Sequence, residues 1–143
     1  MIVLDTTVLV YAKGVGHPLR EPCRTLVTAI SNRHIEATTS VEVIQELVHV
    51  RARRRGRSDA AALGREYADL LGPLTPVSAS DLRTGLALFE SIDGLGAFGA
   101  VLAAATRSAN VGTLVSADRA FAQVSGIDHV FPDASGVATL LRS

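Results

Sequence analysis

The sequence contains a single cysteine, Cys23, which excludes an intrachain disulfide and is typical of a reducing compartment. No apolar run approaches the roughly 20 residues that a membrane-spanning helix needs. The first residues, MIVLD, carry no charged leader and meet an acid at once, so no signal peptide is expected. These absences predict a cytoplasmic protein.

Neither sign of charge is in excess, because 14 Lys and Arg residues balance 14 Asp and Glu residues. Net charge therefore indicates no class of partner, and any affinity for nucleic acid requires a local patch. Repeats, linkers and low-complexity segments are also absent. What is present is a chain of 143 residues, of which 48% are hydrophobic and 20% charged. This composition predicts one folded domain over residues 1–143, with a hydrophobic core large enough to be stable without disulfides or a structural metal.

Short apolar runs alternate with longer segments of helical spacing. Strands are predicted at 1–5, 35–39, 73–77, 112–118 and 128–132, and helices at 18–34, 41–56, 58–72, 78–92, 96–110 and 133–143. Ser40 is the predicted N-cap of helix 41–56, and Gly56 its end. The alternation predicts an α/β fold with a mainly parallel central sheet flanked by helices and joined by right-handed crossovers. The order of the strands stays open.

Three acidic residues are predicted to face the carboxyl edge of this sheet, where ligands bind in such folds. Asp5 ends the first strand, Asp118 follows strand 112–118, and Glu46 lies beside the apolar stripe of helix 41–56. Oxygen ligands around a cleft suit Mg²⁺ or Mn²⁺, and no cluster of His and Cys supports zinc. Such a cation would relieve repulsion among the carboxylates and activate a water for attack on a phosphodiester.

Each of these residues also has a plainer interpretation. An aspartate after a strand is often a helix cap, and this interpretation is strong for Asp118. Glu42 is typical of a solvated acid in the first turn of a helix, and Glu46 alone is typical of a surface residue. His49 and His129 are expected to be ordinary surface or boundary histidines. The joint pattern of acids is more specific than any single position.

Over essentially its whole length, the sequence resembles the PIN-domain ribonucleases, and most closely the VapC toxins of bacterial toxin–antitoxin pairs. The stretch IVLDTTVLVYA is similar to the first motif, with Asp5 as its acid and Thr6 and Thr7 as its small hydroxyl residues. The stretch ATTSVEVIQELVHV is similar to the second motif, with Glu46 in the EL position. The stretch TLVSADRAF is similar to the last motif, with Asp118 as its acid and Ser116 as the nearby hydroxyl.

The resemblance implies a PIN-like fold and an endoribonuclease toxin that inhibits translation and uses Mg²⁺ or Mn²⁺. It implies catalytic and metal-ligating roles for Asp5, Glu46 and Asp118, and supporting roles for Thr6, Ser116 and Glu42. The implied partners are an RNA substrate, either tRNA or rRNA, and a VapB-type antitoxin that neutralises the toxin. The resemblance also implies a homodimer.

The sequence departs from the family pattern at the third acid. In AFGAVLAA every flanking residue matches, but Gly99 stands where the pattern has an aspartate, and the nearest acid is Asp93. The resemblance makes position 99 a metal-ligand position that is vacant here, so metal affinity and catalysis are expected to be impaired, while the fold is not. Either the natural protein has lost this acid, or the substitution makes a toxic nuclease tolerable to its expression host. The intact flanking pattern favours the second hypothesis.

A basic stretch, RARRRGR, follows the second motif. Its five arginines are Arg51, Arg53, Arg54, Arg55 and Arg57. They form either a solvated helix end, where the helix dipole favours cations, or a patch that binds RNA phosphates. The family resemblance favours contact with RNA, and docking of an acidic antitoxin tail is the alternative.

Three other functions share features with this sequence. A HAD-type phosphatase requires a second aspartate two positions after Asp5, where this chain has Thr7. A response-regulator receiver requires paired early acids and a late lysine, but the only lysine is Lys13. A catalytically inactive protein that keeps the PIN fold and only binds an antitoxin is a serious alternative because of Gly99.

Overall fold

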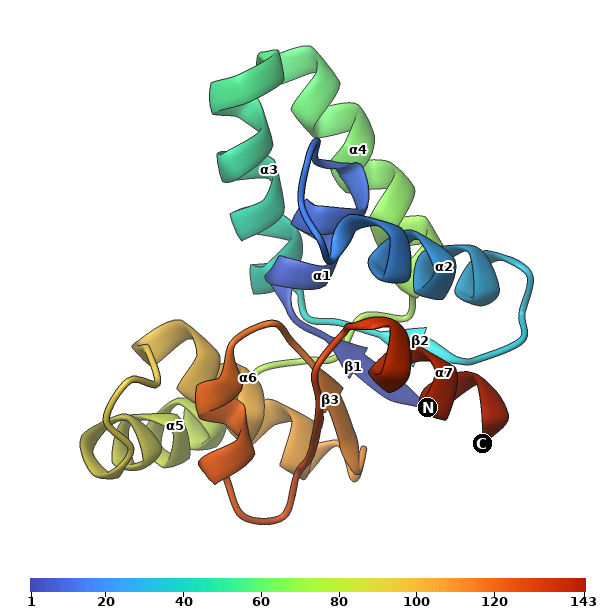
Figure 1. Cartoon of the computed structure of the whole chain (residues 1–143). Coiled ribbons are helices and arrows are strands. Elements are labelled where there is room, and N and C mark those ends of the chain that lie inside the picture. The colour runs from blue at the N-terminus through green and yellow to red at the C-terminus, as the bar shows by residue number, and fades with distance from the viewer.

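The computed structural model describes the whole chain, Met1–Ser143, and its centre is a four-stranded parallel sheet in the order β2-β1-β3-β4 (Figure 1). The predicted α/β class and parallel sheet are therefore confirmed. Along the chain the elements are β1 (Ile2–Leu4), α1 (Thr6–Lys13), α2 (Arg20–Ser31), β2 (Ala37–Thr38), α3 (Val41–Arg55), α4 (Arg57–Leu71), α5 (Ala79–Ser91), α6 (Ala97–Ser108), β3 (Thr113–Val115), the 3-10 helix η1 (Arg119–Gln123), β4 (Asp128–Val130) and α7 (Ala134–Arg142).

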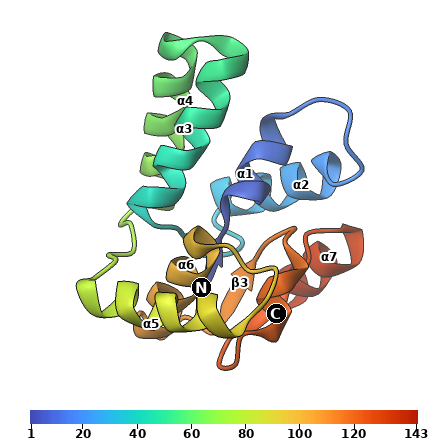
Figure 2. The same ribbon diagram turned by 90° about the vertical axis from the view of Figure 1, so that its left-hand side faces the viewer.

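The strand β1 lies in the middle of the sheet because its three residues are apolar and buried on both faces. It pairs with β2 on one side and with β3 on the other. Helices cover the sheet: α2 packs against α7, and α6 packs against both α5 and β3. Figure 2 shows α5 and α6 on one side of β3 and α7 on the other.

The helices α3 and α4 form a hairpin that projects away from the sheet (Figures 1 and 2). The predicted cap of α3 is confirmed, because the Oγ of Ser40 accepts a hydrogen bond of 3.2 Å from the backbone N–H of Val43. Gly56 separates the two helices at a φ of +86°, a left-handed value that glycine adopts without strain. No helix in the structure is both long and apolar enough to cross a membrane.

The prediction of a strand at 73–77 is wrong. This segment forms one isolated parallel bridge, between Ser40 and Thr75, where the N–H of Thr75 donates to the carbonyl of Thr39 at 2.8 Å. Pro73 has no N–H to donate on the side that faces Thr39, and beyond Ser40 the paired chain turns into α3, so the pairing is confined to Thr75.

A helix that the sequence does not predict follows β1 directly. Helix α1 contains β-branched residues such as Thr6, Thr7 and Val8, which favour strands by local propensity. Burial of Val8 and Leu9 on the face toward the core stabilises the helix instead. Most of the other predicted elements are shorter in the structure: strand 35–39 is confined to Ala37–Thr38, strand 112–118 ends at Val115, and helix 18–34 is confined to Arg20–Ser31.

Candidate active site

The carboxyl ends of β1 and β3 meet at the point where the order of the sheet reverses. The chain adds β2 on one side of β1 and later adds β3 on its other side. Leu4 is aligned with Val115, so the residues that follow, Asp5 and Ser116, leave the sheet side by side. The N–H of Asp5 extends the pairing by donating to the carbonyl of Val115 at 3.0 Å. Open α/β sheets bind their ligands at such a switch point.

Two hydroxyl groups hold the carboxylate of Asp5. The Oγ of Ser116 donates to Oδ2 of Asp5 at 2.6 Å, and the Oγ1 of Thr7 donates to the same oxygen at 3.3 Å. Thr7 is itself held by the N–H of Ala117, which donates to its Oγ1 at 3.0 Å. Both side-chain donors contact Oδ2, so the other carboxylate oxygen has no side-chain donor.

Glu46 of α3 lies close enough to influence Asp5. Burial is the main cause that raises the pKa of the Asp5 carboxyl, since only 9% of this residue is exposed. The negative charge of Glu46 raises this pKa further, whereas the hydrogen bonds from Ser116, Thr6 and Thr7 act in the opposite direction. Two of the predicted acids are thus brought together, one from β1 and one from α3.

The third predicted acid, Asp118, is linked to Asp5 through Ser116. Its N–H donates to the Oγ of Ser116 at 2.9 Å. The Oδ1 of Asp118 caps η1 by accepting from the N–H of Ala120 at 3.0 Å, as its plainer interpretation predicts. On the other side of Ser116, the Nε2–H of His129 donates to the carbonyl of Ser116 at 2.8 Å. Ser116 is therefore the centre of the polar network.

Gly99 is the third residue of α6, in a first turn whose cap, Gly96, provides no side-chain hydrogen bond. A Cβ at this position would lie 2.9 Å from Cζ of Phe121 and 3.3 Å from Cδ1 of Leu95. Phe121 is a buried residue of η1, the short helix that Asp118 caps. The glycine at position 99 thus lets the aromatic ring of η1 pack against α6.

A family model described as PIN domain matches residues 2–127. The chain belongs to the PIN-domain family. The PIN domain here is 59% identical over 142 residues to Ribonuclease VapC7 of Mycobacterium tuberculosis, covering 99% of this chain and 98% of that protein. It is 34% identical over 99 residues to Ribonuclease VapC23 of the same species, covering 68% of this chain and 76% of that protein. This membership leaves the HAD-type phosphatase interpretation without support.

The PIN-domain fold is also found in a solved structure, that of M. tuberculosis VapC20, which is described as a sarcin-ricin loop cleaving toxin. The TM-score is 0.70, and the match covers 89% of this chain and 98% of that protein. At 15% sequence identity, this likeness establishes the fold alone.

The donor chemistry of this PIN domain suits a hard divalent cation. Asp5 and Glu46 supply carboxylate oxygens, and Mg²⁺ is commonly held by one or two carboxylates with water completing its shell. However, no three Asp, Glu, His or Cys side chains are grouped as a metal site. The residues present therefore fit the ion in donor type but provide few protein ligands, and Gly99 contributes none.

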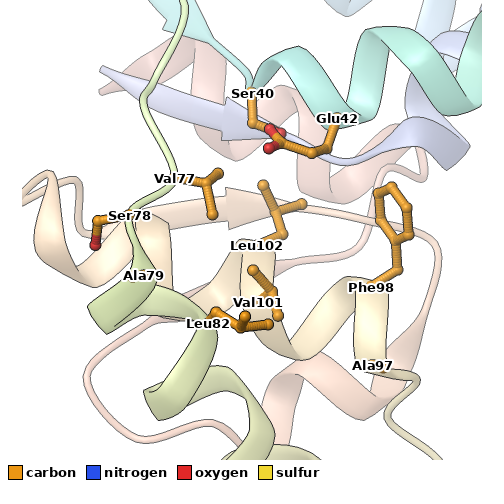
Figure 3. A pocket seen from close by; sticks show the side chains of 10 residues that line it. All are labelled: Ser40, Glu42, Val77, Ser78, Ala79, Leu82, Ala97, Phe98, Val101 and Leu102. Carbon is orange, nitrogen blue, oxygen red and sulfur yellow. The ribbon is translucent and has the colours of Figure 1, made fainter.

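The two hydroxyl residues after Asp5 play different parts in this PIN domain. Thr6, which the resemblance implies as one of the supporting residues, is buried and its Oγ1 has no hydrogen-bond partner. The hydrogen bond to Asp5 comes from Thr7 instead. Sequence reasoning also missed His129, since nothing local to it indicates that β4 pairs beside Ser116. Glu42 is not part of this network, because it faces a separate hollow between α3 and α6 (Figure 3).

The basic stretch lies at the far end of the α3–α4 hairpin. Arg51 is engaged, since its Nε donates to Oδ1 of Asp59 at 2.7 Å and it reaches the carbonyl of Lys13. The remaining four arginines are exposed and make no ion pair, namely Arg53, Arg54, Arg55 and Arg57. Four of the five predicted cations are thus presented to solvent.

Proposed function

We propose that this protein is an endoribonuclease toxin of a toxin–antitoxin pair that hydrolyses RNA phosphodiester bonds and thereby inhibits translation. The observation that carries the proposal is the convergence of Asp5, Glu46 and Ser116 at the β1/β3 switch point of a PIN domain. The near full-length relation to Ribonuclease VapC7 supports it. We propose an RNA substrate, tRNA or rRNA, a VapB-type antitoxin as inhibitor, a homodimeric state and a cytoplasmic location.

Asp5 and Glu46 are the residues proposed to hold Mg²⁺ or Mn²⁺, with Asp118 completing the site directly or through water. When bound, such an ion supplies activation of a water and charge stabilisation of the leaving oxygen. The chain's own contribution is orientation, because Ser116 and Thr7 hold Oδ2 of Asp5 through their hydroxyl groups. Ser116 also fixes the backbone of Asp118.

Gly99 is proposed to impair this activity. An acid at position 99 would lie in the first turn of α6, where the helix dipole favours a negative charge. With glycine there, the site has the charge of Glu46 acting on Asp5 but no group of three acids that could hold a metal ion. The same observation favours the second candidate function, a catalytically inactive PIN domain that only binds an antitoxin.

Cleavage assays on the chain and on Gly99→Asp test both functions. With Mg²⁺ or Mn²⁺ and structured RNA as substrate, we expect weak or no cleavage by the chain and clear cleavage by Gly99→Asp. A Gly99→Asp protein that also carries Asp5→Asn is the matched control and should be inactive. Calorimetry with Mn²⁺ gives a second measure, since Gly99→Asp should bind the ion more tightly. If Gly99→Asp cleaves no RNA with either ion, the ribonuclease proposal is wrong.

A further inference from the structure

A well-formed hollow lies where three helices begin. It has a volume of about 490 Å³, and its wall is formed by the first turns of α3, α5 and α6 and the segment before α5 (Figure 3). Seven of its ten lining residues are hydrophobic. Phe98 stands at its mouth with 47% of its surface exposed. A mainly apolar hollow of this size is typical of a site for a small organic group.

Three polar side chains line the same hollow. Ser40 and Ser78 each accept a backbone hydrogen bond as a helix cap, so each hydroxyl hydrogen remains available to a ligand. Glu42 forms no ion pair, and its carboxylate is directed from α3 toward Ser40, on the side of the hollow away from Phe98 (Figure 3). The hollow thus combines an aromatic face with one unpaired carboxylate.

The hollow adjoins the candidate active site along two elements. Glu42 precedes Glu46 by one turn of α3, and these two acids share one face of that helix. Phe98 directly precedes Gly99 in α6. A nucleotide beside the proposed cleavage point can therefore reach the hollow with its base.

We propose that this hollow binds one unstacked base of the RNA substrate, and that the base is guanine. The inference rests on the proposed ribonuclease function and names a substrate feature that this function leaves open. Proteins recognise single-stranded RNA by stacking splayed bases on aromatic rings and by hydrogen bonds to their edges. Phe98 provides the ring, and the hydrophobic lining residues provide further apolar contact for the base.

The carboxylate of Glu42 selects guanine over the other bases. Guanine presents two adjacent donors, N1–H and the 2-amino group, which match the two oxygens of a carboxylate. Adenine and cytosine present an amino group beside an acceptor nitrogen. Uracil presents one N–H between two carbonyl oxygens, which a carboxylate repels. Guanine alone gives two parallel hydrogen bonds to Glu42.

Charge also favours a base over a second copy of this chain. No Lys or Arg lines the hollow. A two-fold contact centred on this face would bury the Glu42 carboxylates of both copies without a cation to pair with them, which is costly. A guanine base brings its own donors to the same carboxylate.

Binding of short oligonucleotides to the full chain tests the proposal in buffer with EDTA, which prevents cleavage. The probes are a fluorescent five-nucleotide oligouridine with one central guanine and the same strand with inosine, which lacks the 2-amino group. We expect the inosine strand to bind the unmodified chain about tenfold more weakly, because it loses one of the two hydrogen bonds to a charged group. In Glu42→Ala this difference between the two strands should vanish.

Phe98→Ala should weaken binding of both strands by about tenfold, because stacking does not depend on the 2-amino group. Phe89→Ala is the matched control, since Phe89 has the same exposed fraction of 47% but lies on α5 outside the hollow. The affinity of Phe89→Ala for both strands should stay within about twofold of that of the unmodified chain. Sedimentation of each variant records its oligomeric state.

Three results would overturn the base proposal: equal affinity of the unmodified chain for both strands, equal losses in Phe98→Ala and Phe89→Ala, or dissociation of a dimer by Phe98→Ala without loss of RNA affinity. The last result would assign the face to a second copy. Any of them, combined with cleavage by Gly99→Asp, would leave the ribonuclease proposal intact. Failure of every strand to bind, together with no cleavage by Gly99→Asp, would contradict both proposals.

Discussion

The Oγ of Ser116 donates a 2.6 Å hydrogen bond to Oδ2 of Asp5, although the two residues are 111 positions apart in the sequence. This length is typical of a hydroxyl bound to an ionised carboxylate. The bond is one of the forces that lower the pKa of Asp5 against the opposing effect of burial.

Ser116→Ala should raise the pKa of Asp5, because the carboxylate loses its shortest hydrogen bond. Thr7→Val should raise the pKa less, because the Thr7 hydrogen bond is longer, at 3.3 Å. Titration of the Asp5 carboxyl carbon by NMR in metal-free buffer measures both changes. An unchanged pKa of Asp5 in Ser116→Ala would contradict the assigned network.

Asp5 should make stability depend on pH in a predictable direction. Its pKa is raised above the ordinary value of 3.8, mainly by burial, so the folded state binds more protons than the unfolded state between these two pKa values. The contribution of Asp5 to stability is therefore fully present below pH 3.8 and is lost as the pH rises through the folded pKa. Urea unfolding with EDTA should show Asp5→Asn gaining stability relative to the unmodified chain as the pH rises. A constant difference across that range would show that Asp5 has the same pKa in both states.

Gly99 and Phe121 should be energetically coupled. Alanine in place of a helical glycine gains up to about 1 kcal/mol, but here the new Cβ meets the Phe121 ring at 2.9 Å. We expect Gly99→Ala to stabilise the Phe121→Leu protein by about 0.5 kcal/mol more than it stabilises the unmodified chain. Denaturant unfolding of the four proteins measures the coupling. Strict additivity would mean that the ring moves aside freely.

The exposed arginines of the α3–α4 hairpin should contribute to the salt dependence of RNA binding. Replacing Arg53, Arg54 and Arg55 with Gln should reduce the slope of log affinity against log salt by about 2, at roughly 0.7 per phosphate contact with a single strand. Arg51→Gln is the control, because Asp59 already engages that guanidinium. An unchanged slope and an unchanged affinity at low salt in the triple variant would show that the hairpin end does not touch RNA.

Cys23 should be unreactive until the protein unfolds. The thiol is fully buried, and burial raises its pKa to about 12. Alkylation with iodoacetamide at pH 8 should therefore be slow in native buffer and should accelerate only across the urea unfolding transition. Rapid labelling in native buffer would indicate that α2 opens locally.

Local sequence signals were sufficient for most of the helices. In α3, α4, α5, α6 and α7 the apolar spacing and the residues at the ends indicate a helix within a few positions of its observed bounds. They fail at α1, whose β-branched residues favour a strand until the core buries them. They also fail at 73–77, where apolar residues beside two prolines resemble a strand, but the segment forms only one isolated bridge.

The sequence by itself determined the α/β class, the family and the acids at the ends of the strands, because these depend on residue types at short spacings. Only the tertiary structure decided that Asp5 and Ser116 are neighbours, that the hydroxyl of Thr7 rather than that of Thr6 supports the carboxylate, and that three helices enclose a hollow beside Glu42. The register of β1 against β3 and the packing of α3, α5 and α6 join residues far apart in the chain. Such contacts form only when the whole core is buried together, so no local pattern of residues specifies them.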